Sequence, residues 1–267
     1  MKNVATRNDE ELVVQWRMAH SRPVQGPRAA FLTAEWRHLV MLNYEVDAAL
    51  LQPSVPKGTE LDQWQGRTFV SMVGFLFLKA KVLGLTIPFH SAFEEVNLRF
   101  YVKRTEGGEV RRGVVFLKEL VPRRGVAWTA RFFYNENYIA VPMGHEAEIG
   151  KGDAASTVSY RWVYKHQQNR LGLVTEGGFA LPEKGSQEEF ITEHYWGYAR
   201  QPKRGTTVEY LVEHVPWQVA VARSIEFECD VERLYGKEFV PYLEKPPVSG
   251  FLVNGSPVTV YKGRRLA

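Results

Sequence analysis

Polar and apolar side chains alternate along the segment Glu95–Val102. In a β-strand, alternate residues point to opposite faces, so the polar face consists of Glu95, Asn97, Arg99 and Tyr101. This face lacks Lys, Thr and Ser, the usual residues of a solvated strand, and carries groups that form directional, bidentate hydrogen bonds. Two interpretations are open: the face is exposed to water, or it lines the ligand-holding interior of a barrel.

The second interpretation places acid–base chemistry on this strand. A buried Glu95 would need a partner such as Arg99, two residues away on the same face, because burial alone raises the pKa of a carboxyl group. A carboxyl group of raised pKa beside a guanidinium suits general acid–base catalysis or anion binding. We therefore predict Glu95 as a catalytic residue, and Asn97, Arg99 and Tyr101 as ligand-binding residues.

A second polar cluster, Arg131–Tyr138, ends a stretch of strand character. Side chains at the end of a strand lie at a rim, where ligands usually enter. We predict ligand-binding roles for Arg131, Tyr134 and Asn135, with Arg131 a second candidate for the ligand's carboxylate. Tyr138 is predicted to be catalytic, orienting the ligand or donating a proton. A plain surface loop is the alternative for this cluster.

The sequence pattern predicts that these residues are positioned mainly by β-strands, which are separated by turn residues. The turn residues Gly107-Gly108 and Asn254-Gly255 each predict a tight hairpin, the second one between Phe251–Val253 and Val258–Tyr261. The expected strands are Trp36–Val46, Arg67–Leu78, Glu95–Arg104, Gly113–Val121, Gly125–Tyr134, Ser156–His166, Leu171–Thr175, Thr206–His214 and Gln218–Glu228.

Helix is sparse in the sequence. Short helical segments are expected at Ala48–Gln52, Ser186–Tyr198 and Val231–Tyr235, the second opening with a capping-box spacing. Long strand–helix alternation is absent, which argues against a parallel doubly wound sheet. We predict a mainly β fold with a few short helices, in which many strands form a closed or nearly closed antiparallel barrel. Residues 1–28 are expected to form an N-terminal helix and linker, and residues 29–267 a single domain.

Composition excludes several classes of protein. The 267 residues are 45% hydrophobic and 24% charged, the usual globular mixture, which excludes disordered, collagen-like and coiled-coil proteins. The single cysteine, Cys229, excludes an internal disulfide and a multi-cysteine zinc site, and it favours a reducing compartment. A net charge of +4 does not indicate a nucleic-acid partner. The longest apolar run, Val70–Leu78, is far shorter than the ~20 residues of a spanning helix.

Other sequence signals of function are missing. We expect no secretory signal, since the first 20 residues have no apolar core, and the sequence contains no P-loop, dinucleotide-binding fingerprint, HExxH or GxSxG motif. Its histidines form no close pair, so a local metal signature is absent. We therefore expect a soluble cytoplasmic protein with no cofactor, no metal and no membrane or nucleic-acid partner. Homo-oligomerisation is left open.

An ordered series of motifs over roughly residues 30–230 resembles the YqjF-like family, whose function is unknown. That family is similar to the acetoacetate decarboxylase superfamily, so the resemblance implies a twisted antiparallel β barrel with an internal ligand cavity. The segments that carry it are Trp36-Arg37, Asn43–Asp47, Leu61–Ser71, Val73–Phe75, Phe93–Val102, Gly113–Leu117, Asn137-Tyr138 and His214–Trp217.

The resemblance also bears on chemistry. Enzymes of the superfamily decarboxylate a β-keto acid through a Schiff base on a lysine, whose pKa is depressed by a second lysine. In this sequence Tyr138 and Ile139 fall where the two lysines would be, and a tyrosine cannot form an imine. Glu95 matches a glutamate of the decarboxylase cavity. The resemblance therefore implies a small organic acid or carbonyl ligand without Schiff-base decarboxylation.

Two alternatives remain. In the first, the barrel is filled by its own side chains, and the protein is structural or mediates interactions. Alternatively, a relocated lysine forms the Schiff base of a lyase. Lys118 shares a face with Val114 and Phe116 in a regular strand, which permits burial, although strand lysines are more often solvated. The other strand-associated candidates are Lys79, Lys81 and Lys165.

Overall fold

The computed structural model describes residues 29–86, 91–122 and 137–266, and most of them form β-strands, which confirms the mainly β prediction. The strands are β1 (Ala30–Val46), β2 (Glu60–Leu61), β3 (Thr68–Val82), β4 (Leu85–Thr86), β5 (Phe93–Glu106), β6 (Glu109–Val121), β7 (Tyr138–Ala140), β8 (Met143–Glu148), β9 (Thr157–Tyr164), β10 (Gln167–Thr175), β11 (Trp196–Gln201), β12 (Thr206–Glu213), β13 (Val219–Glu228), β14 (Ser249–Tyr261) and β15 (Arg264–Leu266). The helical segments are α2 (Ala48–Leu51), η1 (Gln52–Ser54), α4 (Gln187–Thr192), η2 (Pro202–Arg204), α5 (Val231–Tyr235) and α6 (Val240–Leu243). The predicted helix and linker of residues 1–28 and the predicted strand Gly125–Tyr134 lie outside the described residues.

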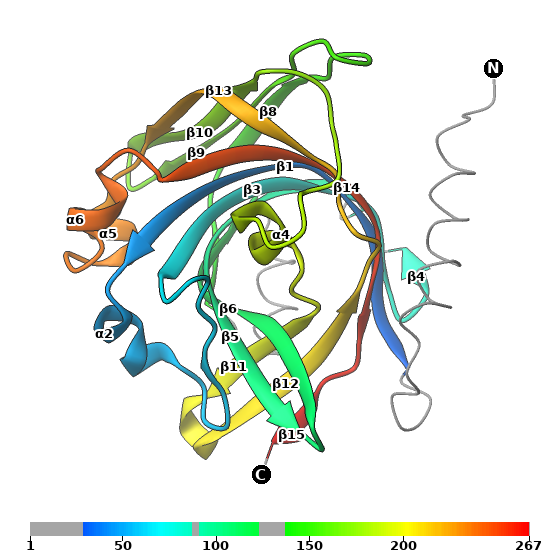
Figure 1. The fold of residues 1–267 in the computed structure, drawn as a ribbon, viewed down its shortest axis with the longest axis vertical. Helices are drawn as coiled ribbons and strands as arrows, with labels where there is room; N and C mark the ends of the chain where they lie inside the picture. The colour runs from blue at the N-terminus through cyan, green and yellow to red at the C-terminus, as the bar shows by residue number, and fades with distance from the viewer. Residues whose placement is uncertain (1–28, 87–90, 123–136, 267) are drawn as a thin grey trace.

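The long strands form a closed ring (Figure 1). Strand β5 lies between β3 and β6, β3 pairs with β1, β1 pairs with β14, and the circuit returns through β12 and β11 to β6. Pairings are antiparallel as predicted, except that β6 pairs in parallel with β11 and with β7 among the described strands. Because the ring is closed, its strands satisfy their backbone hydrogen bonds without leaving long free edges.

A second layer covers part of the ring from outside. From β14 the sheet continues through β13, β10 and β9 to β8, and it folds back so that β9 lies against β1 and β3. An outer core between the ring and this layer contains Leu98 of β5 and Trp162 of β9. An inner core inside the ring contains Met41, Phe69 and Phe190. The ring strands are therefore buried on both faces where the two layers overlap.

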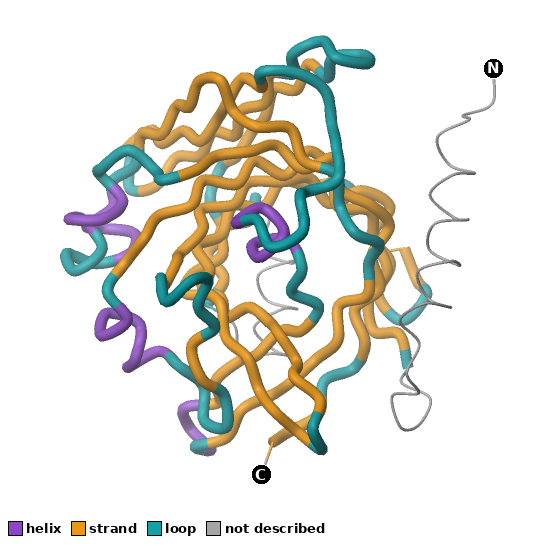
Figure 2. Tube along the Cα trace, in the orientation of Figure 1, coloured by secondary structure: helices purple, strands orange, loops and turns teal. Residues whose placement is uncertain are grey.

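Helix α4 lies inside the ring (Figure 2). At its start the Ser186 side chain accepts a hydrogen bond from the backbone of Glu189 over 3.1 Å, so the capping contact expected from the sequence is present. Phe190 on this helix contacts the rings of Tyr101 and Phe69 in the inner core. No helix among the residues described is long and apolar enough to cross a membrane.

Two predictions about local structure are wrong. The helix predicted over Ser186–Tyr198 ends at Thr192, because the chain from Trp196 onward pairs with β12 as strand β11. The Asn254-Gly255 hairpin does not form, since β14 runs unbroken beside β1. Gly255 has a φ of 76°, and a Cβ atom there would lie 1.9 Å from the carbonyl oxygen of Trp36. The glycine therefore permits a close approach of two bent strands instead of a turn. The Gly107-Gly108 hairpin between β5 and β6 is confirmed.

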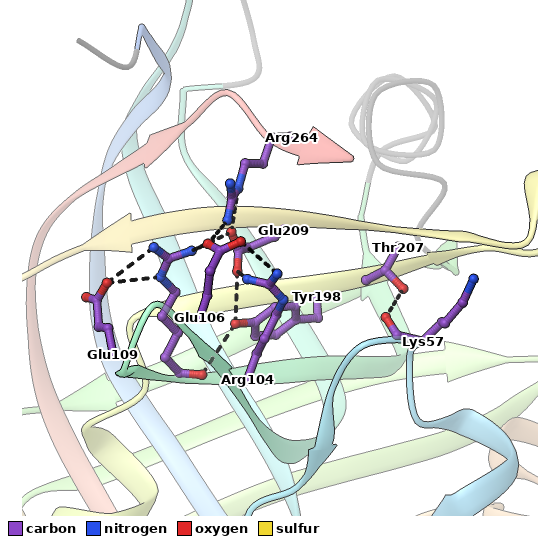
Figure 3. Close-up of polar contacts among 9 residues, drawn as sticks. Lys57, Arg104, Glu106, Glu109, Tyr198, Thr207, Glu209 and Arg264 are labelled. Carbon is purple, nitrogen blue, oxygen red and sulfur yellow. Dashed lines mark hydrogen bonds and ion pairs between the residues drawn. The ribbon is translucent and has the colours of Figure 1, made fainter. Parts of the chain in front are cut away.

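An ion network ties the β5–β6 hairpin to β12 and β15 (Figure 3). Its centre is Glu209 on β12, which is 1% exposed. The Glu209 carboxylate accepts hydrogen bonds from Arg264 Nε over 2.8 Å and from Arg111 Nη1 over 3.2 Å. The other members are Arg104, Glu106 and Glu109. Positive and negative charges balance, so the network stabilises this end of the ring without creating a charged site.

Candidate functional site

The polar face of β5 points into the ring interior. Glu95, Asn97, Arg99 and Tyr101 are 3%, 1%, 7% and 1% exposed, and Tyr101 belongs to the inner core. The opposite, apolar face of the strand packs into the outer core, so that both faces are buried. The four side chains therefore lie as the inward-facing interpretation expects, and their role in binding or catalysis stays a prediction.

One end of this face is acidic. Asn97 Nδ2 donates a hydrogen bond to Glu95 Oε1 over 3.0 Å. The Tyr138 hydroxyl, which comes from β7, donates to the other oxygen of the same carboxylate over 3.4 Å. The two residues predicted to be catalytic are thus brought together, although 43 positions separate them in the chain. A phenol hydrogen-bonded to a buried carboxylate can pass a proton between a ligand and the protein.

A third residue, Glu119 of β6, joins this acidic end and was not predicted. It is 1% exposed and stands in register beside both Asn97 and Tyr138. A β-bulge shifts the register between Lys118, which pairs with Leu98, and Phe116, which pairs with Arg99. The extra residue reverses the inside–outside alternation of β6 and turns Glu119 into the ring. Simple strand periodicity could not have revealed this.

Arg99 occupies a separate position on the same face. Its Nη2 atom lies 3.8 Å from the sulfur of Met41, and its guanidinium carbon lies 5.8 Å from the centroid of the Tyr101 ring. The expected pairing with Glu95 is wrong, because no carboxylate of the described residues lies within ion-pair distance of this guanidinium. The Nε atom of Arg99 is buried and has no hydrogen-bond partner in that part of the chain. Arg99 therefore carries a positive charge inside the ring that no described carboxylate pairs with.

A row of hydrogen bonds crosses four strands next to Arg99. Arg99, Ser71, Asn43 and Ser249 stand in register on β5, β3, β1 and β14. Ser71 donates to Asn43 Oδ1 over 2.6 Å, and Asn43 donates to Ser249 over 2.9 Å. The single hydroxyl proton of Ser71 is thereby used, so the Tyr101 hydroxyl donates to Ser71 over 2.5 Å. The row orients Tyr101 and leaves the guanidinium of Arg99 outside its hydrogen bonds.

Aromatic side chains from the loop after β12 lie within electrostatic range of Arg99. The His214 ring stacks on Trp217 at 3.9 Å, and Trp217 Nε1 donates to Ser256 Oγ over 2.9 Å. Burial lowers the pKa of His214 to about 4, and the positive charge of Arg99 acts in the same direction. The ring is therefore neutral at pH 7. Its Nδ1 lies 2.8 Å from the carbonyl oxygen of Val215 and donates a hydrogen bond to it.

None of the four candidate lysines enters the ring interior. Lys79, Lys81 and Lys165 are exposed. The bulge in β6 places Lys118 on the outer-core face opposite Leu98, where its ammonium donates to the carbonyl oxygen of Leu234. The expectation that Lys118 shares the face of Val114 and Phe116 is therefore wrong. The structure offers no support for a relocated Schiff-base lysine among the residues described.

The remaining predicted ligand-binding residues, Arg131, Tyr134 and Asn135, lie outside the described residues. Within residues 29–86, 91–122 and 137–266, no three histidine, cysteine or acidic side chains converge as a metal site would need. The candidate site thus consists of an acidic end at Glu95, Glu119 and Tyr138, and a cationic position at Arg99.

The family model of the uncharacterized conserved proteins called DUF2071 matches residues 9–257. The chain belongs to the DUF2071 family. A curated relative, the uncharacterized protein YqjF of Bacillus subtilis (strain 168), is 28% identical over 215 residues, which are 80% of this chain and 84% of the relative. The YqjF-like resemblance drawn from the motifs is therefore confirmed.

Solved structures share the fold of this DUF2071 protein. An acetoacetate decarboxylase-like enzyme from Sphingomonas wittichii RW1 matches with a TM-score of 0.59 and 14% identity, covering 89% of this chain and 93% of the enzyme. The enduracididine biosynthesis enzyme MppR, in complex with pyruvate, matches with a TM-score of 0.61 and 13% identity, covering 94% of each chain. At this identity the likeness shows the acetoacetate decarboxylase-like fold alone.

Proposed function

We propose that the ring interior binds a small organic acid or carbonyl compound and that Arg99 binds the carboxylate of this ligand. The proposal is carried by the isolation of the guanidinium, which is 7% exposed and has no carboxylate partner among the described residues. Arginine remains charged at physiological pH and cannot relieve its burial by losing a proton. An unpaired buried charge costs several kcal/mol, which an anionic ligand would offset.

The acidic end supplies the chemistry of the proposal. A ligand whose carboxylate contacts Arg99 would extend its carbonyl group along β5 toward Glu95 and Tyr138. Glu95 would act as a general base on the carbon next to the carbonyl, and the Tyr138 hydroxyl would donate to the carbonyl oxygen. The reaction proposed is proton exchange through an enolate. It needs no imine, in keeping with a tyrosine at position 138 and the outward course of Lys118.

The fold neighbours support this class of ligand without deciding it. MppR binds pyruvate, a compound with a carboxylate and an adjacent carbonyl group. The competing function is that of a structural or interaction protein with a filled ring. It is favoured by the packing of aromatic side chains at one part of the inner core, where Trp36 contacts Phe75, Phe77 and Trp217.

Ligand-induced stabilisation separates the two functions. Pyruvate, acetoacetate and butyrate at millimolar concentration should raise the Tm of the wild-type protein, because a ligand that binds only the folded state stabilises it. Arg99→Gln should abolish the rise. Arg67→Gln is the matched control, since Arg67 is partly exposed and its charge is already paired with Glu45. A filled ring predicts no rise with any of these acids, and equal behaviour of Arg99→Gln and wild type.

The acid–base role is tested by hydrogen exchange of the ligand. In D₂O the wild-type protein should accelerate loss of the pyruvate methyl proton signal, and Glu95→Gln should slow that loss by about 10²-fold or more. Glu94→Gln is the control, because Glu94 is the neighbouring residue and contacts the exposed His145 instead. If wild type and Glu95→Gln exchange at the same rate, Glu95 is not the base.

A further inference from the structure

A buried histidine–aspartate pair lies beside the proposed ligand site. Asp62 follows β2, and its backbone N–H donates to the carbonyl oxygen of Tyr101 over 3.0 Å. His194 follows α4, with a side chain that is 1% exposed, and its Nε2 lies 3.2 Å from Asp62 Oδ2. Arg112 Nε donates to the same carboxylate oxygen over 2.6 Å. Asp62 is therefore held in place and orients the imidazole of His194.

This pair determines which ring nitrogen of His194 carries the proton. Burial by itself raises the pKa of Asp62, but the hydrogen bonds from His194 and Arg112 outweigh burial and bring it to about 2. The ionised carboxylate only accepts hydrogen bonds. Burial lowers the pKa of His194 to about 4, so its ring is neutral at pH 7. Nε2–H therefore donates to Asp62, and Nδ1 keeps a free lone pair.

Among the described residues, the acceptor on His194 has no partner, and neither has a donor on the nearby Arg99. His194 Nδ1 is buried without a hydrogen bond from any described residue, and the same is true of Arg99 Nε. Both side chains lie against the Tyr101 ring. The centroids of the His194 and Tyr101 rings are 4.6 Å apart, and Arg99 Cζ lies 5.8 Å from the Tyr101 centroid. Unsatisfied buried polar groups are uncommon in folded proteins because each one costs free energy.

A single small molecule could satisfy both groups if it carried an anionic acceptor and a hydroxyl donor. We propose that the ligand of the ring interior carries a hydroxyl group in addition to the carboxylate and carbonyl of the proposed function: the carboxylate binds Arg99, and the hydroxyl donates a hydrogen bond to His194 Nδ1. The inference rests on the proposed function and narrows its ligand class. A keto oxygen only accepts hydrogen bonds, so it cannot satisfy Nδ1. A site that hydrogen-bonds a substrate hydroxyl discriminates against analogues that lack one.

Calorimetric titration with four acids of equal chain length tests this inference: butyrate, 2-hydroxybutyrate, 3-hydroxybutyrate and 4-hydroxybutyrate. At least one hydroxybutyrate should bind the wild-type protein about tenfold or more tightly than butyrate, because the deoxy acid leaves Nδ1 unsatisfied. His194→Phe keeps an aromatic ring against Tyr101 and should bind that hydroxy acid and butyrate with equal affinity. His145→Phe, at an exposed histidine bonded to Glu94, should retain the wild-type preference.

A spectroscopic measurement on wild-type protein covers the case in which His194→Phe does not fold. The ¹⁵N resonance of His194 Nδ1 should shift on addition of the preferred hydroxybutyrate and stay in place on addition of butyrate. The hydroxy-acid inference is overturned if all four acids bind equally, or if the Nδ1 resonance responds in the same way to the hydroxybutyrate and to butyrate. Either result leaves the Arg99 proposal standing. Failure of every acid, pyruvate included, to bind the wild-type protein overturns both.

Discussion

The guanidinium of Arg99 points at the thioether of Met41, with 3.8 Å between Nη2 and Sδ, although the carboxylate of Glu95 lies on the same face of the same strand. A sulfur atom is a weak hydrogen-bond acceptor and provides no negative charge. The two charges that the sequence would pair are thus kept apart within the ring. The proposed ligand, with its carboxylate at Arg99 and its reactive group at Glu95, requires this separation.

The first prediction concerns stability without ligand. Arg99→Met should increase the free energy of unfolding by about 1–4 kcal/mol, because a buried charge is replaced by an apolar side chain of similar length. Urea unfolding of wild type and variant measures the change. Arg67→Met should change stability by less than about 1 kcal/mol, since it removes a partly exposed ion pair. A marked loss of stability in Arg99→Met would show that Arg99 is a structural residue of a filled ring.

The second prediction concerns acid. The pKa of His214 is lowered by burial to about 4 from an ordinary value of 6.5. As the pH falls from 6.5 to about 4, the unfolded chain therefore binds a proton that the folded protein excludes, and the stability of the fold decreases. One such histidine accounts for about 3 kcal/mol over this interval.

The matched variant for this prediction is His214→Phe, which keeps a ring against Trp217 and removes the titrating group. Its free energy of unfolding should fall less steeply than that of wild type between pH 7 and pH 4. The exposed His145 provides the control His145→Phe, which should follow the wild-type curve. Parallel curves for wild type and His214→Phe would mean that folding does not shift the pKa of His214.

Local periodicity was sufficient to predict the polar face of β5, because a regular strand alternates and β5 stays regular from Glu95 to Tyr101. It could not reveal Glu119, since the bulge that turns this residue inward depends on how β6 pairs with β5. The same limit applies to Lys118, which the bulge moves to the opposite face.

Contacts between distant segments were also beyond the sequence. Asn43 and Ser71 sit among apolar residues and become a polar row only through the register of β1, β3 and β5. His194 and Asp62 are 132 positions apart, and neither belongs to a motif of its own. Gly255 follows asparagine, the usual hairpin signal, but its positive φ bends a continuous strand.

The third prediction is the absence of an imine on any native lysine. Burial lowers the pKa of Lys118, and the charge of Lys165 acts in the same direction, which makes Lys118 the candidate for an unusually reactive amine. Its ammonium nevertheless lies at the carbonyl oxygen of Leu234, on the outer-core face. Borohydride added with pyruvate should therefore trap no adduct on Lys118, as determined by peptide mass spectrometry.

A positive control sharpens this test. Tyr138→Lys places an amine beside Glu95 in the proposed ligand site. This variant should give an adduct at position 138 under the same conditions, provided that pyruvate enters the ring. An adduct on Lys118 in the wild-type protein would restore the Schiff-base mechanism.

The last prediction concerns the ion network around Glu209. Because this side chain is 0% exposed and contacts Arg111 and Arg264, Glu209→Gln leaves cationic groups without their central partner. We expect the free energy of unfolding to fall by about 3 kcal/mol, the usual effect of breaking a buried pair.

Glu109→Gln, in the partly exposed outer part of the network, should cost less than about 1 kcal/mol. Urea unfolding in low and high salt distinguishes the two positions, because salt screens the Glu109 pair far more than the buried carboxylate. Equal losses for the two variants would mean that the fold does not depend on Glu209 as the centre of this network.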